Sequence, residues 1–243
     1  MEPELRPVRT GDETFARGST YDAQEIALHD QGRKVLRNTY LLLAASLIPT
    51  AIGAALGANL DLSFMRTSPI ISAFAILGIF YGWIFAIEKN RNSGLGVGLL
   101  LGFTLFMGLL LGPLLQFVLG MGNGVQLVGM AAIGTAAVFF GLAGVASTAK
   151  RNFSAMGNFL LVGAIVIMLG VVANIFFASP LVHLVLLGAF IVFSSLVILW
   201  QVNQIVRGGE TSYISATLSL YVAVYNIFSS LLQILGIFGG ERD

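Results

Sequence analysis

The 243-residue chain contains no cysteine. It therefore forms no disulfide bond, and thiolate nucleophiles and cysteine metal sites are excluded. Charged residues make up only 10% of the chain, whereas hydrophobic residues make up 56%. Soluble domains are about one quarter charged. Together with a mean hydropathy of +0.88, this composition indicates a membrane protein.

Ionisable groups are also missing from the middle of every long apolar run. Proton relays and cation pathways typically use such groups inside the membrane. The sequence shows no nucleophile–base pair, no cluster of metal ligands and no phosphate-binding loop. The net charge of +1, without a basic patch, argues against a nucleic-acid partner. We therefore expect a protein that is not an enzyme and that has no catalytic residue, cofactor or metal.

The first 33 residues are hydrophilic and carry seven acidic side chains against four arginines. A segment with so little apolar surface cannot form a packed core, so Met1–Arg33 is predicted to be a disordered tail. The stretch Tyr21–Leu28 is predicted to form a short helix at most. About thirty hydrophilic residues precede the first apolar run, so no signal peptide is expected. Residues 34–243 are predicted to form one transmembrane domain.

Seven apolar runs follow, each close to the roughly 20 residues that a spanning helix needs. They are Thr39–Leu60, Pro69–Ile87, Leu95–Leu119, Val125–Thr148, Met156–Ala178, Leu181–Ile205 and Ile214–Phe238. Gly120–Gly124 and Ser179–Pro180 are almost bare turns, so neighbouring helices should be antiparallel. Runs of this length exclude a β-barrel, and the predicted fold class is an all-α, seven-helix transmembrane bundle. Pro49 and Pro113 are expected to kink the first and third helices.

Lysine and arginine near the span ends collect on one side of the predicted bundle. That side has eight cations and the other has two. The eight are Arg33, Lys34, Arg37, Lys89, Arg91, Lys150, Arg151 and Arg207; the two are Arg66 and Arg242. Because cytoplasmic loops are enriched in lysine and arginine, the N-terminus is predicted to be cytoplasmic. An odd number of spans then places the C-terminus outside.

Glycine is abundant, with 29 residues, and recurs at small-xxx-small spacing. The pairs are Gly53/Gly57, Gly78/Gly82, Gly98/Gly102 and Gly108/Gly112. Such pairs allow two helix backbones to approach closely. With this much glycine some pairs arise by chance, so the spacing predicts close packing without assigning a particular helix–helix face.

The last span carries an unusual number of polar residues. Ser215, Ser219, Asn226, Ser230 and Gln233 fall within an arc of roughly 80° on a helix that turns about 100° per residue, and Ala223 lies in the same arc. Polar groups that face hydrocarbon are costly, so this face is predicted to turn toward other helices or an enclosed cavity. The opposite side, with Leu218, Leu220 and Leu232, can pack against protein or lipid. The last span is predicted to be the central helix; a peripheral span with a modest contact face is the alternative.

Other neutral polar residues lie in the fifth and sixth spans: Asn174, Ser194, Ser195, Gln201, Asn203 and Gln204. Gln201 and Asn203 are predicted to join the polar residues of the last span in the bundle interior. For most of these residues the expected role is hydrogen bonding between helices, worth about 1 kcal/mol or less each. His183 is expected to form a hydrogen bond at the outer interface. Gly208–Thr211 is predicted to be a loop that ends in a helix cap at Thr211 or Ser212.

Several motifs together carry a resemblance. They are LRNTY at Leu36–Tyr40, LGPLL at Leu111–Leu115, VVANIF at Val171–Phe176, NQI at Asn203–Ile205 and GGETSYISATLSLYVAVYNIFSSLLQILG at Gly208–Gly236. From about Lys34 to the C-terminus, the chain resembles the Bax inhibitor-1 family, and within it the bacterial YccA branch. The resemblance implies a seven-helix fold in which the other six helices surround the last one.

In that branch, the resemblance implies a protein of the bacterial inner membrane that binds a membrane-anchored AAA protease of the FtsH type. It would modulate the protease as a slowly processed substrate, engaged through the cytoplasmic N-terminal tail. The tail predicted here fits that role, because an unfoldase needs a loose end to pull.

Other branches of the family are linked to a pH-sensitive calcium leak that depends on two aspartates in the last two helices. Alignment through NQI and LYVAVYN places these positions at Gln201 and Ala223, and neither residue can ionise. This difference favours the protease-binding hypothesis. The alternative is an ion-leak channel or a small-solute transporter through the centre of the bundle.

Overall fold

The computed structural model describes residues 12–60, 67–149 and 153–240, with side chains from residue 31 onward. The regular elements of these residues are helices: α1 (Asp12–Gly57), α3 (Pro69–Lys89), α4 (Gly94–Leu119), α5 (Gly124–Thr148), α6 (Met156–Phe177), α7 (Pro180–Val206) and α8 (Tyr213–Gly239). Within these residues, seven segments are long and apolar enough to cross a membrane, and the one in α1 is Gln31–Gly57. The prediction of a seven-helix, all-α bundle is confirmed. Helices α1 and α4 continue past Pro49 and Pro113.

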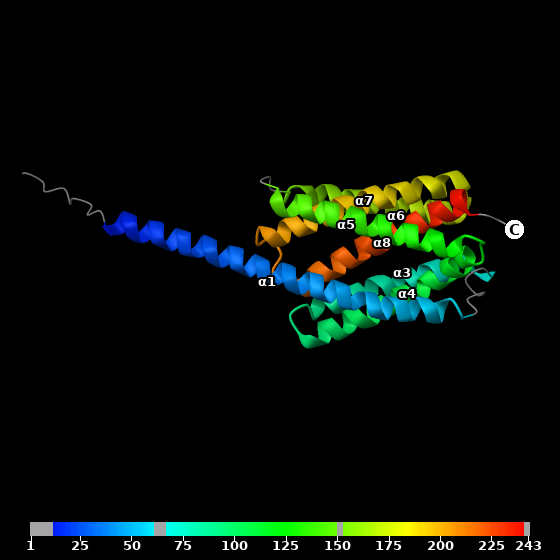
Figure 1. Cartoon of the computed structure of the whole chain (residues 1–243), viewed down its shortest axis with the longest axis horizontal. Coiled ribbons are helices and arrows are strands. Elements are labelled where there is room, and N and C mark those ends of the chain that lie inside the picture. The colour runs from blue at the N-terminus through cyan, green and yellow to red at the C-terminus, as the bar shows by residue number, and fades with distance from the viewer. Residues whose placement is uncertain (1–11, 61–66, 150–152, 241–243) are drawn as a thin grey trace, which may run out of the picture.

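Helix α1 differs from the sequence-based prediction at its N-terminal end. Composition predicts a disordered tail up to Arg33, whereas the structure has one continuous 46-residue helix from Asp12. Residues 1–11 of that predicted tail lie outside the described residues. Nucleating a helix is costly, but extending one that the membrane span has already formed is not, so polar residues can continue it. The N-terminal part of α1 leaves the bundle and projects beyond it (Figure 1).

Helix α8 lies between two groups of helices (Figure 1). Helices α1, α3 and α4 lie on one side of it, and α5 and α7 on the other; α8 packs against all five. Helix α6 packs mainly on α7. The α6 span is only 6% buried, against 39% for α8 and for α4. The last helix is therefore central, but five helices surround it rather than six, because α6 forms an outer layer on α7.

Helices α1 and α4 meet through two of the four predicted glycine pairs. A Cβ atom at Gly53 or Gly57 would collide with the α4 backbone at Leu105 or Leu109. A Cβ atom at Gly108 would collide with the α1 backbone at Thr50, and one at Gly112 would collide with Gly57. The two backbones touch because no side chain separates them. We call these four residues, Gly53, Gly57, Gly108 and Gly112, the glycine interlock.

The other two glycine pairs do not hold helices together. A Cβ atom at Gly78, Gly82 or Gly98 would meet nothing within 4 Å, and one at Gly102 would meet only the Trp83 ring, at 3.1 Å. Spacing in the sequence cannot separate the two kinds of pair, because it does not show which face of a helix meets a neighbour.

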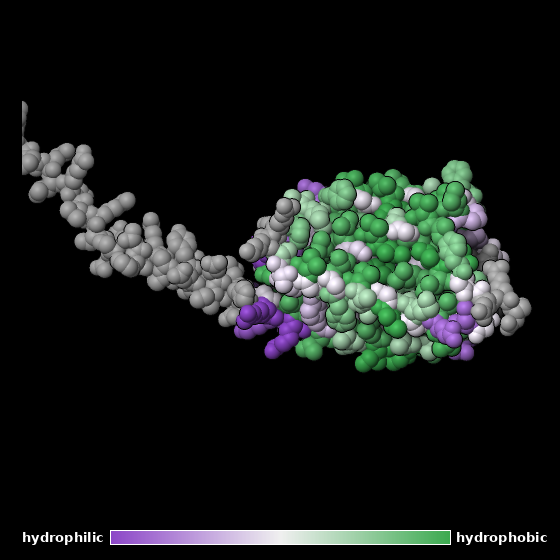
Figure 2. Space-filling view, turned by 45° about the horizontal axis from the view of Figure 1, so that its top comes forward, coloured by the Kyte–Doolittle hydropathy of each residue, from purple (hydrophilic) through white to green (hydrophobic). Residues whose placement is uncertain are grey.

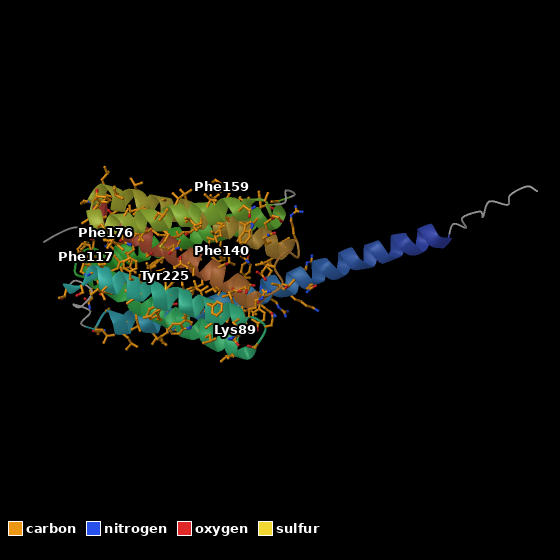
Figure 3. The ribbon with its side chains drawn as sticks, turned by 180° about the vertical axis from the view of Figure 1, so that it is seen from behind. Lys89, Phe117, Phe140, Phe159, Phe176 and Tyr225 are labelled. Carbon is orange, nitrogen blue, oxygen red and sulfur yellow. The ribbon has the colours of Figure 1, made fainter. Side chains whose placement is uncertain are left out.

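The surface of the bundle is a broad apolar band with hydrophilic residues at its two ends (Figure 2). Large exposed hydrophobic side chains form this band, among them Phe140, Phe159 and Phe176, which Figure 3 labels. Lys89 lies at the end where α1 leaves the bundle (Figure 3). We call this the basic end, since Arg33, Lys34 and Arg37 also lie where α1 leaves the bundle.

The charge bias leads to a topology prediction that the structure does not address. Because eight cations flank one side of the spans and two the other, we expect a cytoplasmic N-terminus and an external C-terminus. A reporter that is active only outside the cytoplasm should be active when fused after Asp243 and silent when fused before Arg33. The reverse pattern would contradict this orientation of the seven spans.

Candidate functional site

The candidate site is the polar face of α8 together with the contacts that hold its two ends. Within the predicted polar arc, Ser215, Ala223 and Ser230 are buried. Ser219, Asn226 and Gln233 are partly exposed. The opposite side is buried too, since Leu218, Leu220 and Leu232 are at most 5% exposed. Helix α8 therefore buries its apolar side against protein, whereas its polar face is buried only in part.

At the basic end, a set of hydrogen bonds ties the start of α8 to the α3–α4 turn. Ser212 is the helix cap: its Oγ accepts from the Ser215 amide at 3.3 Å and donates to the Arg91 carbonyl at 2.9 Å. Ser215 Oγ donates to Glu88 Oε2 at 2.9 Å, and the Ser212 amide donates to Glu210 Oε1 at 2.8 Å. Both carboxylates thus bind beside the N-terminus of α8, where the helix dipole favours negative charge.

The end of α7 holds the α5–α6 connection. Asn203 Oδ1 accepts from the Phe153 amide at 3.1 Å, and Gln204 Oε1 accepts from Ser154 Oγ at 3.0 Å. Arg207 Nη2 donates to the Ala149 carbonyl at 3.2 Å. Asn203 is buried, but its carbonyl oxygen is used to fix this connection. This hydrogen bond joins Asn203 to the residue that precedes α6.

Gln201 and Ala223, the positions that match the family's aspartate pair, lie on the adjacent helices α7 and α8. Each is only 2% exposed. Among the residues with described side chains, the two carboxylates, Glu88 and Glu210, form hydrogen bonds at the basic end. Among the described residues no group of three or more His, Cys, Asp or Glu side chains could hold a metal ion. Neither Gln201 nor Ala223 can exchange a proton here.

At the opposite end, α8 is held by amide side chains. His183 Nε2 and Gln233 Oε1 are 3.0 Å apart, and Gln233 Nε2 donates to the Ser229 carbonyl at 3.2 Å. Asn123 Nδ2, at the start of α5, donates to the Gly239 carbonyl at 2.6 Å. His183 is exposed and pairs across the α7–α8 contact, so its interaction is the interfacial hydrogen bond expected from the sequence.

A hydrogen-bonded node in the middle of the bundle was not predicted. The Tyr221 hydroxyl lies 2.8 Å from Thr50 Oγ1 and donates to the Thr104 carbonyl at 3.3 Å. It thereby joins α8 to α1 and α4, and the tyrosine is 1% exposed. The sequence analysis assigned no role to this residue. The missed signal is the phenol itself, because a hydroxyl in the middle of a span needs a partner.

The neutral character of the site leads to a prediction on ion flux. In liposomes we expect little calcium flux, without strong dependence on pH between about 6 and 8, since only a perturbed carboxylate or a histidine titrates there. His183→Ala serves as the control for the one histidine in the spans. Gln201→Asp combined with Ala223→Asp should introduce pH-dependent flux and lower stability, because two carboxyl groups would be buried. Strong calcium flux from the unmodified protein, unaffected by His183→Ala, would contradict this expectation.

Comparison with known proteins places these features in context. The family model described as "Inhibitor of apoptosis-promoting Bax1" matches residues 32–240. An uncharacterized protein of Neisseria meningitidis serogroup A is 45% identical over 224 residues, which is 91% of this chain and 99% of the relative. The protein named "Modulator of FtsH protease YccA" of Escherichia coli K12 is 43% identical over 203 residues, which is 84% of this chain and 90% of the relative. A protein of E. coli O6:H1 that is also 43% identical over 203 residues is named "Inner membrane protein YccA".

Proposed function

The chain belongs to the Bax inhibitor-1 family, and on that premise we propose that it modulates a membrane-anchored AAA protease of the FtsH type. It is a multi-pass inner-membrane protein with seven apolar helices. The observation that carries the proposal is the 43% identity to a named modulator of FtsH over most of both chains. The names of the family and of that relative describe an inhibitor and a modulator, and the role proposed here is likewise not enzymatic.

The proposed point of contact is the N-terminal segment. Helix α1 leaves the bundle at its basic end, so residues 12–30 extend away from the packed spans (Figure 1). A stretch of 19 helical residues, 12–30, reaches about 28 Å at 1.5 Å per residue. With the N-terminus in the cytoplasm, this segment presents a chain end where a cytoplasmic unfoldase can engage it.

Inhibition then follows from slow processing. A protease that holds this chain end without extracting the bundle is occupied and cannot take another substrate. Hydrogen bonds and close backbone packing between the helices would make the bundle resistant to extraction. The protein would act as a competitor that leaves the protease slowly, and no group in it needs to react.

A leak of ions or small solutes through the bundle is the second candidate. Ser219, Asn226 and Gln233 favour it, because they are neutral polar residues that stay partly exposed on α8. The non-ionisable pair Gln201 and Ala223 weighs against a proton-gated calcium path of the family type. The two candidates differ in partner, so they can be separated directly.

Crosslinking in native membranes followed by purification tests the proposal. We expect the protein to be recovered with an FtsH-type protease, and a chain that lacks residues 1–30 should recover less of it. Recovery of the protein without any protease, combined with ion flux in liposomes, would contradict the proposal and support the leak.

A further inference from the structure

We infer that α1 is the extraction barrier: its contacts with α4, α7 and α8 set the rate at which a protease that pulls on the N-terminus can remove the protein from the membrane. This inference rests on the function proposed above. It assigns the slow step of processing to the contacts of α1 and not to the packing of the other helices.

The contacts of α1 are spread along the whole span. At the basic end, a Cβ atom at Gly32 would lie 3.0 Å from the Ile205 carbonyl oxygen, so the α1 backbone lies directly on the end of α7. Val35 packs with Ile205 and Ala216 in one buried cluster. One turn further along α1, Thr217 Oγ1 donates a hydrogen bond to the Thr39 carbonyl at 3.3 Å.

In the second half of the span, one side-chain hydrogen bond is followed by contacts between backbones. The Tyr221 hydroxyl lies 2.8 Å from Thr50 Oγ1, and the glycine interlock with α4 comes next along α1. Gln116 Nε2 of α4 donates to the Ala58 carbonyl just beyond the end of α1. The membrane span of α1 is thus held near its start by α7 and α8, in its middle by α8, and toward its end by α4.

The direction of pulling gives these contacts their effect. Helix α1 is continuous from Asp12 to Gly57, so force applied to its N-terminal part acts along the helix axis. Sliding α1 along its axis must break the contacts with α4, α7 and α8 together, since interlocked backbones cannot pass one another without separating. Extraction under force depends on the unfolding rate, so an interaction that must break before α1 moves controls it directly.

Helix α6 provides the contrast within the same molecule. It packs mainly on α7 and is the least buried span. Leu160 is its buried residue, at 6% exposed. If α1 is the barrier, loss of packing at Leu160 lowers the stability of the bundle but leaves the extraction rate unchanged. If overall stability sets the rate, the same loss accelerates extraction.

The test is degradation of the full-length protein in proteoliposomes by a purified FtsH-type protease with ATP. Binding of the protein to the protease and the rate at which the full-length protein is degraded are measured separately. Tyr221→Phe removes the hydroxyl that joins α8 to α1 and α4, and Thr50 keeps its bond to the Ser46 carbonyl. We expect unchanged binding and degradation at least about fivefold faster, because the substitution removes the contacts of this hydroxyl with both Thr50 and Thr104. Tyr81→Phe, on the exposed face of α3, is the matched control and should have no effect.

Leu160→Ala completes the experiment, with thermal unfolding recorded for every variant. We expect it to lower the unfolding temperature by more than Tyr221→Phe does and to leave the degradation rate unchanged. Faster degradation of Leu160→Ala, or an unchanged rate for Tyr221→Phe, would overturn the assignment of the barrier to α1. Absence of protease binding by the unmodified protein would instead overturn the proposed function, so the two failures are distinguishable.

Discussion

Replacing Gly112 by alanine is expected to lower the free energy of unfolding by about 3 kcal/mol, because one methyl group would force α1 and α4 apart. The added Cβ atom would collide with the Gly57 backbone. Neither side of this contact can give way by a change of rotamer, since both are main chain. The separation of the helices would also loosen the Tyr221–Thr50 hydrogen bond, about two turns away along α1.

Gly78→Ala is the matched control for this prediction. Gly78 belongs to a pair with the same spacing, but a Cβ atom there would meet nothing within 4 Å. We expect its effect to stay within about 0.5 kcal/mol, as for surface substitutions away from special features. Denaturant unfolding in detergent, followed by circular dichroism, measures both. Equal effects of the two substitutions would show that the glycine interlock does not hold α1 and α4 together.

Deleting residues 1–30 is expected to leave the bundle folded and to extend the lifetime of the protein in cells several-fold. The deletion removes the proposed handle but stops before Gly32 and Val35, where α1 begins to pack on α7 and α8. Without a chain end to pull, an AAA protease cannot start extraction.

A pulse–chase experiment measures this lifetime, and thermal unfolding of the purified truncated protein checks that the bundle is intact. A useful control is a scrambled segment of the same length and composition, which should keep the turnover of the full chain if a loose end is sufficient. If the truncated protein is degraded as fast as the full-length one, the N-terminal segment is not the handle.

The sequence by itself determined the fold class and the boundaries of the last six spans. Apolar runs of about 20 residues have one solution in a bilayer, because every backbone amide must find its partner within its own helix. The predicted spans therefore match the observed helices closely from α3 to α8. The first boundary was placed at Thr39, whereas the apolar helical segment begins at Gln31. Hydropathy marks where apolar residues end, and a helix can continue through charged ones.

Only the tertiary structure decided which polar and small residues act together. The polar arc of α8 was visible in the sequence, but its partners, such as Glu88 for Ser215, lie more than 100 residues away. The sequence likewise did not show that Tyr221 bonds to α1 and α4, or which two glycine pairs form the glycine interlock. Helix periodicity gives the angle of each side chain around its own axis. The rotation and depth of one helix against another depend on the packing of all seven, and a local pattern does not contain that information.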